Sequence, residues 1–189
     1  MPKKLIFTIV GLILIAELIW GGWSLTRKFT KTPAQITTQQ TQAKSTISLK
    51  SSKNSFKIGE NIPVTIELFS GKVTDGADII LTYDPKKLQI IPASTKVPVA
   101  VGNLYNDYPI NKVDESTGYI FVSGITSQAN GVMANGVFGT ISFKAKAAGS
   151  TKISVNFTPN STVDSNIIEN KSAKDLLIGV KNLEVNIIP

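Results

Sequence analysis

The chain has 189 residues, 42% of them hydrophobic, and a formal net charge of +7. It contains neither cysteine nor histidine, which excludes disulfide bonds, a catalytic thiolate, a His-dependent triad and a His-ligated zinc centre. No nucleophile motif or phosphate-binding loop is present among the other residues. We therefore predict that the protein is not an enzyme and uses no metal or cofactor.

The positive charge is concentrated near the N-terminus. Residues 1–45 carry six basic side chains and one acidic one, a net charge of +5. Residues 46–189 carry 14 lysines and 12 acidic side chains, a net charge of +2. Binding of nucleic acid needs a concentrated basic face on the folded domain, so we predict no nucleic-acid partner.

The first predicted element is an apolar run at residues 5–25. Its 21 residues, at about 1.5 Å each in a helix, are enough to cross a hydrocarbon layer of about 30 Å. We predict that residues 1–26 form a single-pass signal anchor in the plasma membrane, with the C-terminal domain outside. A cleaved signal peptide stays open as the alternative, although the best cleavage site, Gly22-Trp23-Ser24, is poor.

A change of composition follows the apolar run. Residues 27–45 are rich in threonine and glutamine, and such a segment has too little apolar surface to bury. We predict a flexible linker that holds the following domain away from the membrane.

From residue 46 onward the chain alternates short apolar stretches with turn residues. Many short strands with frequent turns are typical of a sandwich, so we predict an all-β domain at 46–189, a jelly-roll β-sandwich of about nine strands. The predicted strands are residues 47–50, 62–69, 77–83, 88–91, 110–114, 119–125, 139–146, 152–157 and 177–187. Residues 172–177 are expected to form a helical turn at most.

Two segments in this domain are distinctive. In residues 76–91, apolar side chains alternate with a period of two up to an Asp-Pro turn, which predicts a strand with one buried face. In residues 136–149 the same alternation groups Val137 with Ile141 on one face and puts Phe138 on the other. Each segment alone fits any β-sandwich.

Five motifs in this order and spacing resemble the cohesin family, over roughly residues 47–187. They are Phe-Lys-Ile-Gly-Glu at 56–60, Ile-Pro-Val-Thr-Ile at 62–66, Tyr-Asp-Pro at 83–85, Gly-Tyr-Ile-Phe-Val-Ser at 118–123 and Gly-Val-Phe-Gly-Thr-Ile at 136–141. The resemblance implies a nine-stranded jelly-roll. It also implies recognition of a protein, because cohesins hold dockerin domains on cellulosomes and bacterial cell surfaces.

The resemblance also suggests which residues bind the partner. In type I cohesins, dockerin binds the face built by the family's strands 8, 3, 6 and 5, and an Asp and an Asn of strand 3 make much of the hydrogen bonding. Asp78 stands at the Asp position and Gly76 at the Asn position. Ser123 and Thr126 stand where strand 6 normally offers an apolar and an acidic residue. We predict a partner-binding face with these four residues and Ile80, although Asp78 also fits an ordinary solvated position.

Two functions follow as hypotheses. The first is a membrane-anchored, exported recognition module that binds a dockerin-like protein in a cell-surface or cellulosome-type assembly. The second is a carbohydrate-binding module, because exposed aromatic rings stack on sugars of a polysaccharide. Tyr105 and Tyr108 are its candidate residues, since the domain has no tryptophan. The interpretation that we favour for these two tyrosines is that they pack their own loop.

Overall fold

The computed structural model describes residues 44–95, 97–161 and 163–189. They belong to one compact unit, Thr41–Pro189. The predicted membrane segment, and the predicted linker up to residue 43, lie outside the described residues. Where the chain is described, no helix is long and apolar enough to span a membrane.

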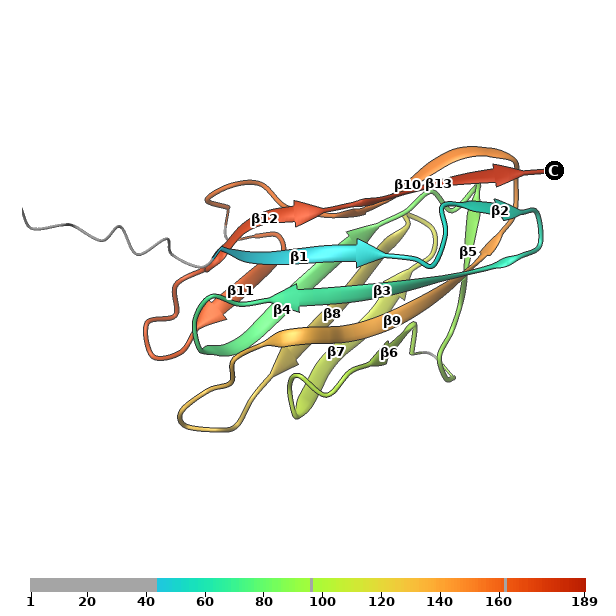
Figure 1. Ribbon diagram of the computed structural model, residues 1–189. Helices are drawn as coiled ribbons and strands as arrows, with labels where there is room; N and C mark the ends of the chain where they lie inside the picture. The colour runs from blue at the N-terminus through green and yellow to red at the C-terminus, as the bar shows by residue number, and fades with distance from the viewer. Residues whose placement is uncertain (1–43, 96, 162) are drawn as a thin grey trace, which may run out of the picture. The chain divides into compact units, whose positions relative to one another are not determined.

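The described residues form two β-sheets and no helix (Figure 1). In the first sheet the order is β12 (Leu177–Lys181), β1 (Ser45–Lys50), β3 (Asn61–Phe69), β9 (Asn135–Ala145) and β5 (Leu88–Ile91), and β6 (Val99–Val101) also pairs with β9. In the second sheet the order is β2 (Ser55–Lys57), β13 (Leu183–Ile188), β10 (Gly149–Val155), β4 (Thr74–Thr82), β8 (Tyr119–Ile125) and β7 (Asp107–Asp114), and β11 (Asn166–Glu169) also pairs with β4. The prediction of an all-β sandwich is confirmed.

The core lies between the two sheets because their strands alternate buried and accessible residues. In β3, the side chains of Ile62, Val64, Ile66 and Leu68 are buried, and the residues between them face outward. The predicted alternation in β4 is also confirmed. Fully burying one such side chain stabilises the fold by about 1.5–3 kcal/mol, so the period-two pattern is enough to fix which face of each strand is inside.

One strand departs from the predicted alternation. In the β3–β9 ladder, Ile66 pairs with Gly139 and the next residue pairs with Val137, so Phe138 is an extra residue in β9. Beyond such a β-bulge, the side chains that would have pointed inward point outward, and the reverse. As a result Phe138 is buried and Val137 is exposed. The predicted grouping of Val137 with Ile141 is wrong, because strict alternation cannot include a bulge.

The nine predicted strands all overlap strands of the structure, but the last one is two strands. Residues 177–187 form β12 in the first sheet and β13 in the second. They separate at Asn182, whose side-chain oxygen accepts a hydrogen bond from the backbone of Val155 at 2.9 Å. Residues 172–177 form no helix, which agrees with the expectation of a helical turn at most; the stretch contains a turn residue, an isolated bridge at Asp175 and the first residue of β12. The short strands β2, β6 and β11 were not predicted.

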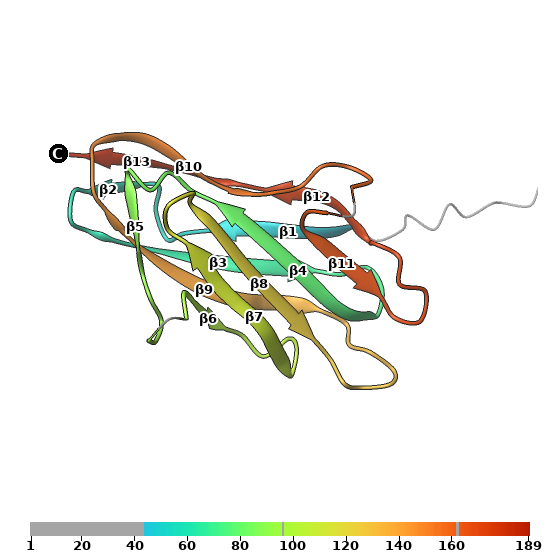
Figure 2. The same cartoon turned by 180° about the vertical axis from the view of Figure 1, so that it is seen from behind.

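One side of β4 is paired by two separate strands. Both β10 and β11 run antiparallel to it: Ser154 of β10 pairs with Thr82, and Asn166 of β11 pairs with Asp78. Residues 156–165, here called the β10–β11 loop, leave the sheet between them. Figure 2 shows β11 beside β4, with β8 and β7 on its other side. These strands bring together the face that carries the predicted partner-binding residues.

Candidate recognition face

The outer face of the second sheet is organised in rows across β11, β4, β8 and β7 (Figure 2). The registers of the ladders define these rows because residues that pair across strands point to the same side. From one end to the other the rows are Ile168–Gly76–Ile125–Asp107, Asn166–Asp78–Ser123–Ile110, Ile80–Phe121–Lys112 and Thr82–Tyr119–Asp114. We call this surface the recognition face.

Asp78 lies at the centre of the recognition face and is held from both sides. The hydroxyl of Ser123 donates to Oδ1 of Asp78 at 2.5 Å, and the amide of Asn166 donates to its Oδ2 at 3.4 Å. The Asn166 side-chain oxygen accepts from the backbone N–H of Asp78 at 3.3 Å. The carboxylate is therefore fixed in orientation and half-buried, unlike an ordinary solvated side chain. Sequence reasoning missed Asn166, because only the fold brings residue 166 next to residue 78.

Apolar side chains surround this polar centre. Ile110, Ile125 and Tyr119 are 43%, 41% and 39% exposed. The rings of Tyr119 and Phe121 stack with centroids 6.0 Å apart, and the ammonium of Lys112 lies 5.4 Å from the Phe121 centroid. Exposed apolar and aromatic residues around a few fixed polar groups are typical of protein–protein interfaces.

Gly76 lies in the same face as Asp78, but its position cannot take a side chain without movement. A Cβ atom there would lie 2.7 Å from the carbonyl oxygen of Gly124 and 3.2 Å from Cγ2 of Ile125. β4 and β8 therefore approach each other closely at this point. We therefore predict that an asparagine side chain at this position would push the two strands apart.

Thr126 lies one residue beyond the end of β8. Its backbone N–H donates to the carbonyl oxygen of Asp75 at 2.8 Å, and its hydroxyl oxygen accepts from the backbone of Gln128 at 3.2 Å. These bonds fix the start of the loop that follows. Thr126 thus belongs to the edge of the recognition face, while Ile80 lies one row from Asp78 on β4.

The two tyrosines proposed for sugar binding are not an exposed platform. Tyr105 is buried, its hydroxyl lies 2.9 Å from Oγ1 of Thr74, and burial raises its pKa to about 12. Tyr108 is half-buried and packs edge-on against Phe138, with centroids 5.4 Å apart. Gly124 makes room for these rings. Both rings pack their loop against the core, as the interpretation that we favour from the sequence expects, and the alternative of a carbohydrate-stacking pair is not favoured.

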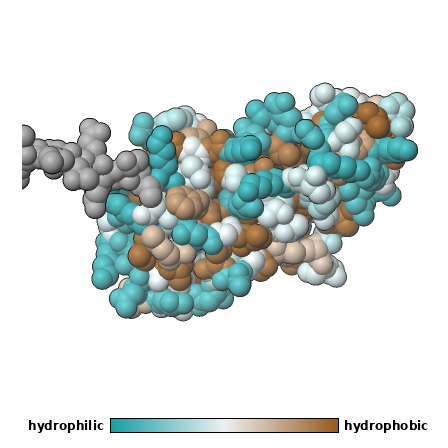
Figure 3. Space-filling view, viewed as in Figure 1, coloured by the Kyte–Doolittle hydropathy of each residue, from teal (hydrophilic) through white to brown (hydrophobic). Residues whose placement is uncertain are grey.

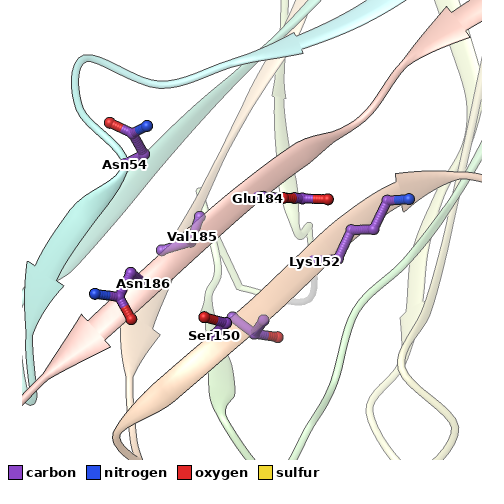
Figure 4. Close-up of a pocket in the computed structure, with 7 residues that line it drawn as sticks. Asn54, Ser150, Lys152, Glu184, Val185 and Asn186 are labelled. Carbon is purple, nitrogen blue, oxygen red and sulfur yellow. The ribbon is translucent and has the colours of Figure 1, made fainter.

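Two other surfaces are less suited to recognition. A hollow of about 500 Å³ between β10 and β13 is lined by polar side chains, among them Lys152 opposite Glu184 (Figure 4). Its charged lining residues are one lysine and one glutamate, so the hollow carries no net charge. On the first sheet, hydrophilic and hydrophobic residues are intermixed (Figure 3), and exposed Phe69 and Val137 lie near an ion pair, Lys50 with Glu67 at 2.5 Å.

Together, the fold and this face define a class of protein: an all-β recognition sandwich. Groups of three or more acidic side chains that could hold a metal are absent from the described residues. The sequence model of the cohesin domain matches residues 36–176, well over half of the chain. The chain belongs to the cohesin family. Cohesin modules are non-catalytic protein-binding domains, which confirms the prediction that the protein is not an enzyme.

Solved cohesins share the fold. A type II cohesin domain from the cellulosome of Acetivibrio cellulolyticus is 18% identical with a TM-score of 0.63, over 76% of this chain and 95% of that one. A chain of a mutant type II cohesin–X-dockerin complex from the same organism is 18% identical with a TM-score of 0.61, over 77% and 100%. A type I cohesin from Pseudobacteroides cellulosolvens is 20% identical with a TM-score of 0.58, over 77% and 92%. No curated protein sequence matches the chain significantly.

Proposed function

We propose that this domain binds a dockerin-like protein module through the recognition face. The observation that carries the proposal is the order of strands. The structure has the order β10–β4–β8–β7, with Asp78 on β4 and the motif of residues 118–123 largely on β8. This order corresponds to strands 8, 3, 6 and 5, which form the dockerin-binding face of type I cohesins. Two of the structurally similar cohesins are from complexes with an X-dockerin and with a Cel5 dockerin.

The side chains that this recognition face offers to a partner differ from those that a type I dockerin meets. Gly76, Ser123 and Thr126 depart from the type I pattern, so the hydrogen bonds of the usual asparagine and of the usual acidic side chain are not available. The exposed side chains of Ile110 and Ile125 offer apolar contacts instead. A dockerin that suits this face would place apolar residues over them and a hydrogen-bond donor at Asp78.

The test is a selection with the segment 41–189, which forms its own compact unit with its own core. A displayed library of dockerin modules, with the X-dockerin and Cel5 dockerin of Acetivibrio cellulolyticus included, is selected against the immobilised domain. We expect at least one dockerin to be enriched over unrelated displayed modules, and the enrichment to be lost on the Asp78→Ala variant. If no dockerin is enriched, the proposed function is overturned.

We also propose that residues 5–25 anchor the chain in the plasma membrane, with the domain on the outside. The length and apolar character of this run support the proposal. The full chain should stay with membranes after alkaline carbonate extraction, and external protease should digest the domain in intact cells. Release of the full chain by carbonate, or protection of the domain from protease, would contradict this arrangement.

A further inference from the structure

The recognition face is hollowed where it meets the β10–β11 loop. This depression has a volume of about 270 Å³. Its walls come from β4, β7, β8 and the loop, and include Asp78, Ile80, Ile110, Phe121, Val163 and Asp164. It is smaller than the hollow of Figure 4, but it contains two aspartates and no lysine or arginine, whereas the hollow of Figure 4 contains Lys152 beside Glu184.

Asp164 is an unusual member of this wall. It is only 6% exposed. Its Oδ2 accepts a hydrogen bond from the backbone N–H of Thr158 at 2.5 Å, whereas its buried Oδ1 has no hydrogen-bond partner among the described residues. A buried carboxylate is normally ion-paired or fully hydrogen-bonded, because leaving it unpaired is costly. Half of this carboxylate lacks its partner.

Among the described residues, no ion pair compensates for the charges of Asp164 and Asp78. The ion pairs among the described residues are Lys50–Glu67, Lys53–Glu60 and Lys72–Glu169, all outside the depression. Asp78 receives hydrogen bonds from neutral donors only, and the nearby ammonium of Lys112 lies over the Phe121 ring. Within the part of the chain that the structure describes, the depression therefore holds two carboxylates that form no ion pair, although residues 46–189 as a whole carry a net charge of +2.

The other walls of the depression are apolar. Ile80 on β4, Phe121 on β8 and Ile110 on β7 line it. Val163 of the β10–β11 loop, which is 86% exposed, also lines it. A side chain with an aliphatic stem and a cationic head can cover apolar walls and still place its charge near carboxylates.

We infer that this depression takes a lysine or arginine side chain of the partner protein. The stem packs between Ile110 and Val163, and the head lies close enough to Asp164 and Asp78 to balance their charge. The inference rests on the proposed function in that the partner protein docks on the recognition face. To the proposed function it adds one specific contact, between a basic side chain of the partner and the β10–β11 loop.

The test uses small cations as probes, because they require no partner. The segment 41–189, labelled with ¹⁵N, is titrated with n-butylammonium chloride, with n-propylguanidinium chloride and with neutral n-pentanol. We expect the cations to shift the amide signals of Ile80, Phe121 and Ser123 saturably, with an apparent affinity about fivefold higher than that of pentanol. Asp164→Asn should remove this preference, since asparagine keeps an acceptor for Thr158 but has no charge.

A matched control is Glu184→Gln, which removes one exposed negative charge on β13 of the same sheet. It should leave the preference for cations unchanged. Equal shifts with pentanol and the cations, or an equal loss in Glu184→Gln and Asp164→Asn, would overturn the inference. If Asp164→Asn does not fold, the variant Val163→Lys tests the inference instead. Its lysine ammonium should occupy the depression and block the binding of butylammonium. Unimpaired binding of butylammonium to this variant would contradict the inference.

The two proposals fail separately. If the cations bind in the depression but no dockerin is selected, the proposed function is wrong and the depression still selects cations. If a selected dockerin binds Asp164→Asn as tightly as the wild type, and no lysine or arginine of that dockerin is needed, the inference is wrong and the proposed function stands.

Discussion

Asp78 on β4 and Ser123 on β8 face each other across the ladder, and the Ser123 hydroxyl donates to Oδ1 of Asp78 at 2.5 Å. By sequence, Asp78 fits the type I cohesin pattern and Ser123 departs from it. In the structure they form one unit, because the serine fixes the carboxylate that a partner would meet.

The first prediction concerns Asp78 itself. Asp78→Ala should weaken binding of a selected dockerin by about 1.5–3 kcal/mol, since a hydrogen bond to a charged group is worth about this much. Titration calorimetry measures the change. Gln89→Ala, an exposed change on β5 of the other sheet, should leave the affinity unaltered. If Asp78→Ala bound the dockerin with wild-type affinity, the Asp78 carboxylate would not contribute to binding.

The second prediction is that Ser123 acts through Asp78. Ser123→Ala should weaken binding by less than Asp78→Ala, about 0.5–1.5 kcal/mol, because it removes one neutral donor to the carboxylate. The double variant should bind no worse than Asp78→Ala alone, which a double-mutant cycle by calorimetry shows. Additive losses would mean that Ser123 contacts the partner independently of Asp78.

The third prediction assigns Tyr105 a structural role. Tyr105→Phe removes the buried hydrogen bond to Thr74 and should lower the free energy of unfolding by about 1 kcal/mol, as measured with urea. Tyr119→Phe, on an exposed ring, is the matched control and should change stability little. An unchanged stability in Tyr105→Phe would show that this hydroxyl contributes nothing to the fold.

The fourth prediction follows from the same burial. The pKa of Tyr105 is raised from 10.0 to about 12 in the folded domain, so its neutral form favours folding. This contribution is fully present below pH 10 and is lost as the pH rises from about 10 to 12. The stability difference between wild type and Tyr105→Phe should therefore shrink over this range. A constant difference from pH 9 to pH 12 would contradict the raised pKa.

Much of the fold was predictable because burial sets the period of each strand. The alternations in β3 and β4 leave only one choice of inward face, and turn residues mark most strand ends. The bulge at Phe138 was not predictable from alternation, since a strict period of two has no place for an extra residue. The division of residues 177–187 between two sheets also has no local signal beyond Asn182.

The candidate site was predictable only where it is local in sequence. Asp78, Ile80 and Ser123 come from two strands whose motifs are distinctive, and the ladder brings them together. Asn166 and Asp164 come from a strand and a loop far along the chain. Their place on the recognition face depends on the pairing of β11 with β4. This is a long-range contact that no pattern in residues 156–169 predicts.

The fifth prediction tests whether Gly76 departs from the type I pattern for steric reasons. A side chain at this position would meet the Gly124 carbonyl oxygen and the Ile125 side chain of β8. Gly76→Asn should therefore force β4 and β8 apart and lower the free energy of unfolding by about 1–3 kcal/mol, as measured with urea. Because Asp78 and Ser123 lie one row away, the affinity for a selected dockerin should fall as well.

The matched control is Gly179→Asn, because a side chain at Gly179 on β12 meets nothing within 4 Å. It should change stability far less than Gly76→Asn, since both replace glycine by asparagine within a strand and only one meets a neighbouring backbone. If Gly76→Asn instead keeps wild-type stability and gains affinity for a dockerin that the wild type does not bind, the close approach of β4 and β8 is not what excludes asparagine. The type I pattern would then be only one substitution away, and the apolar contacts at Ile110 and Ile125 would not set the choice of partner.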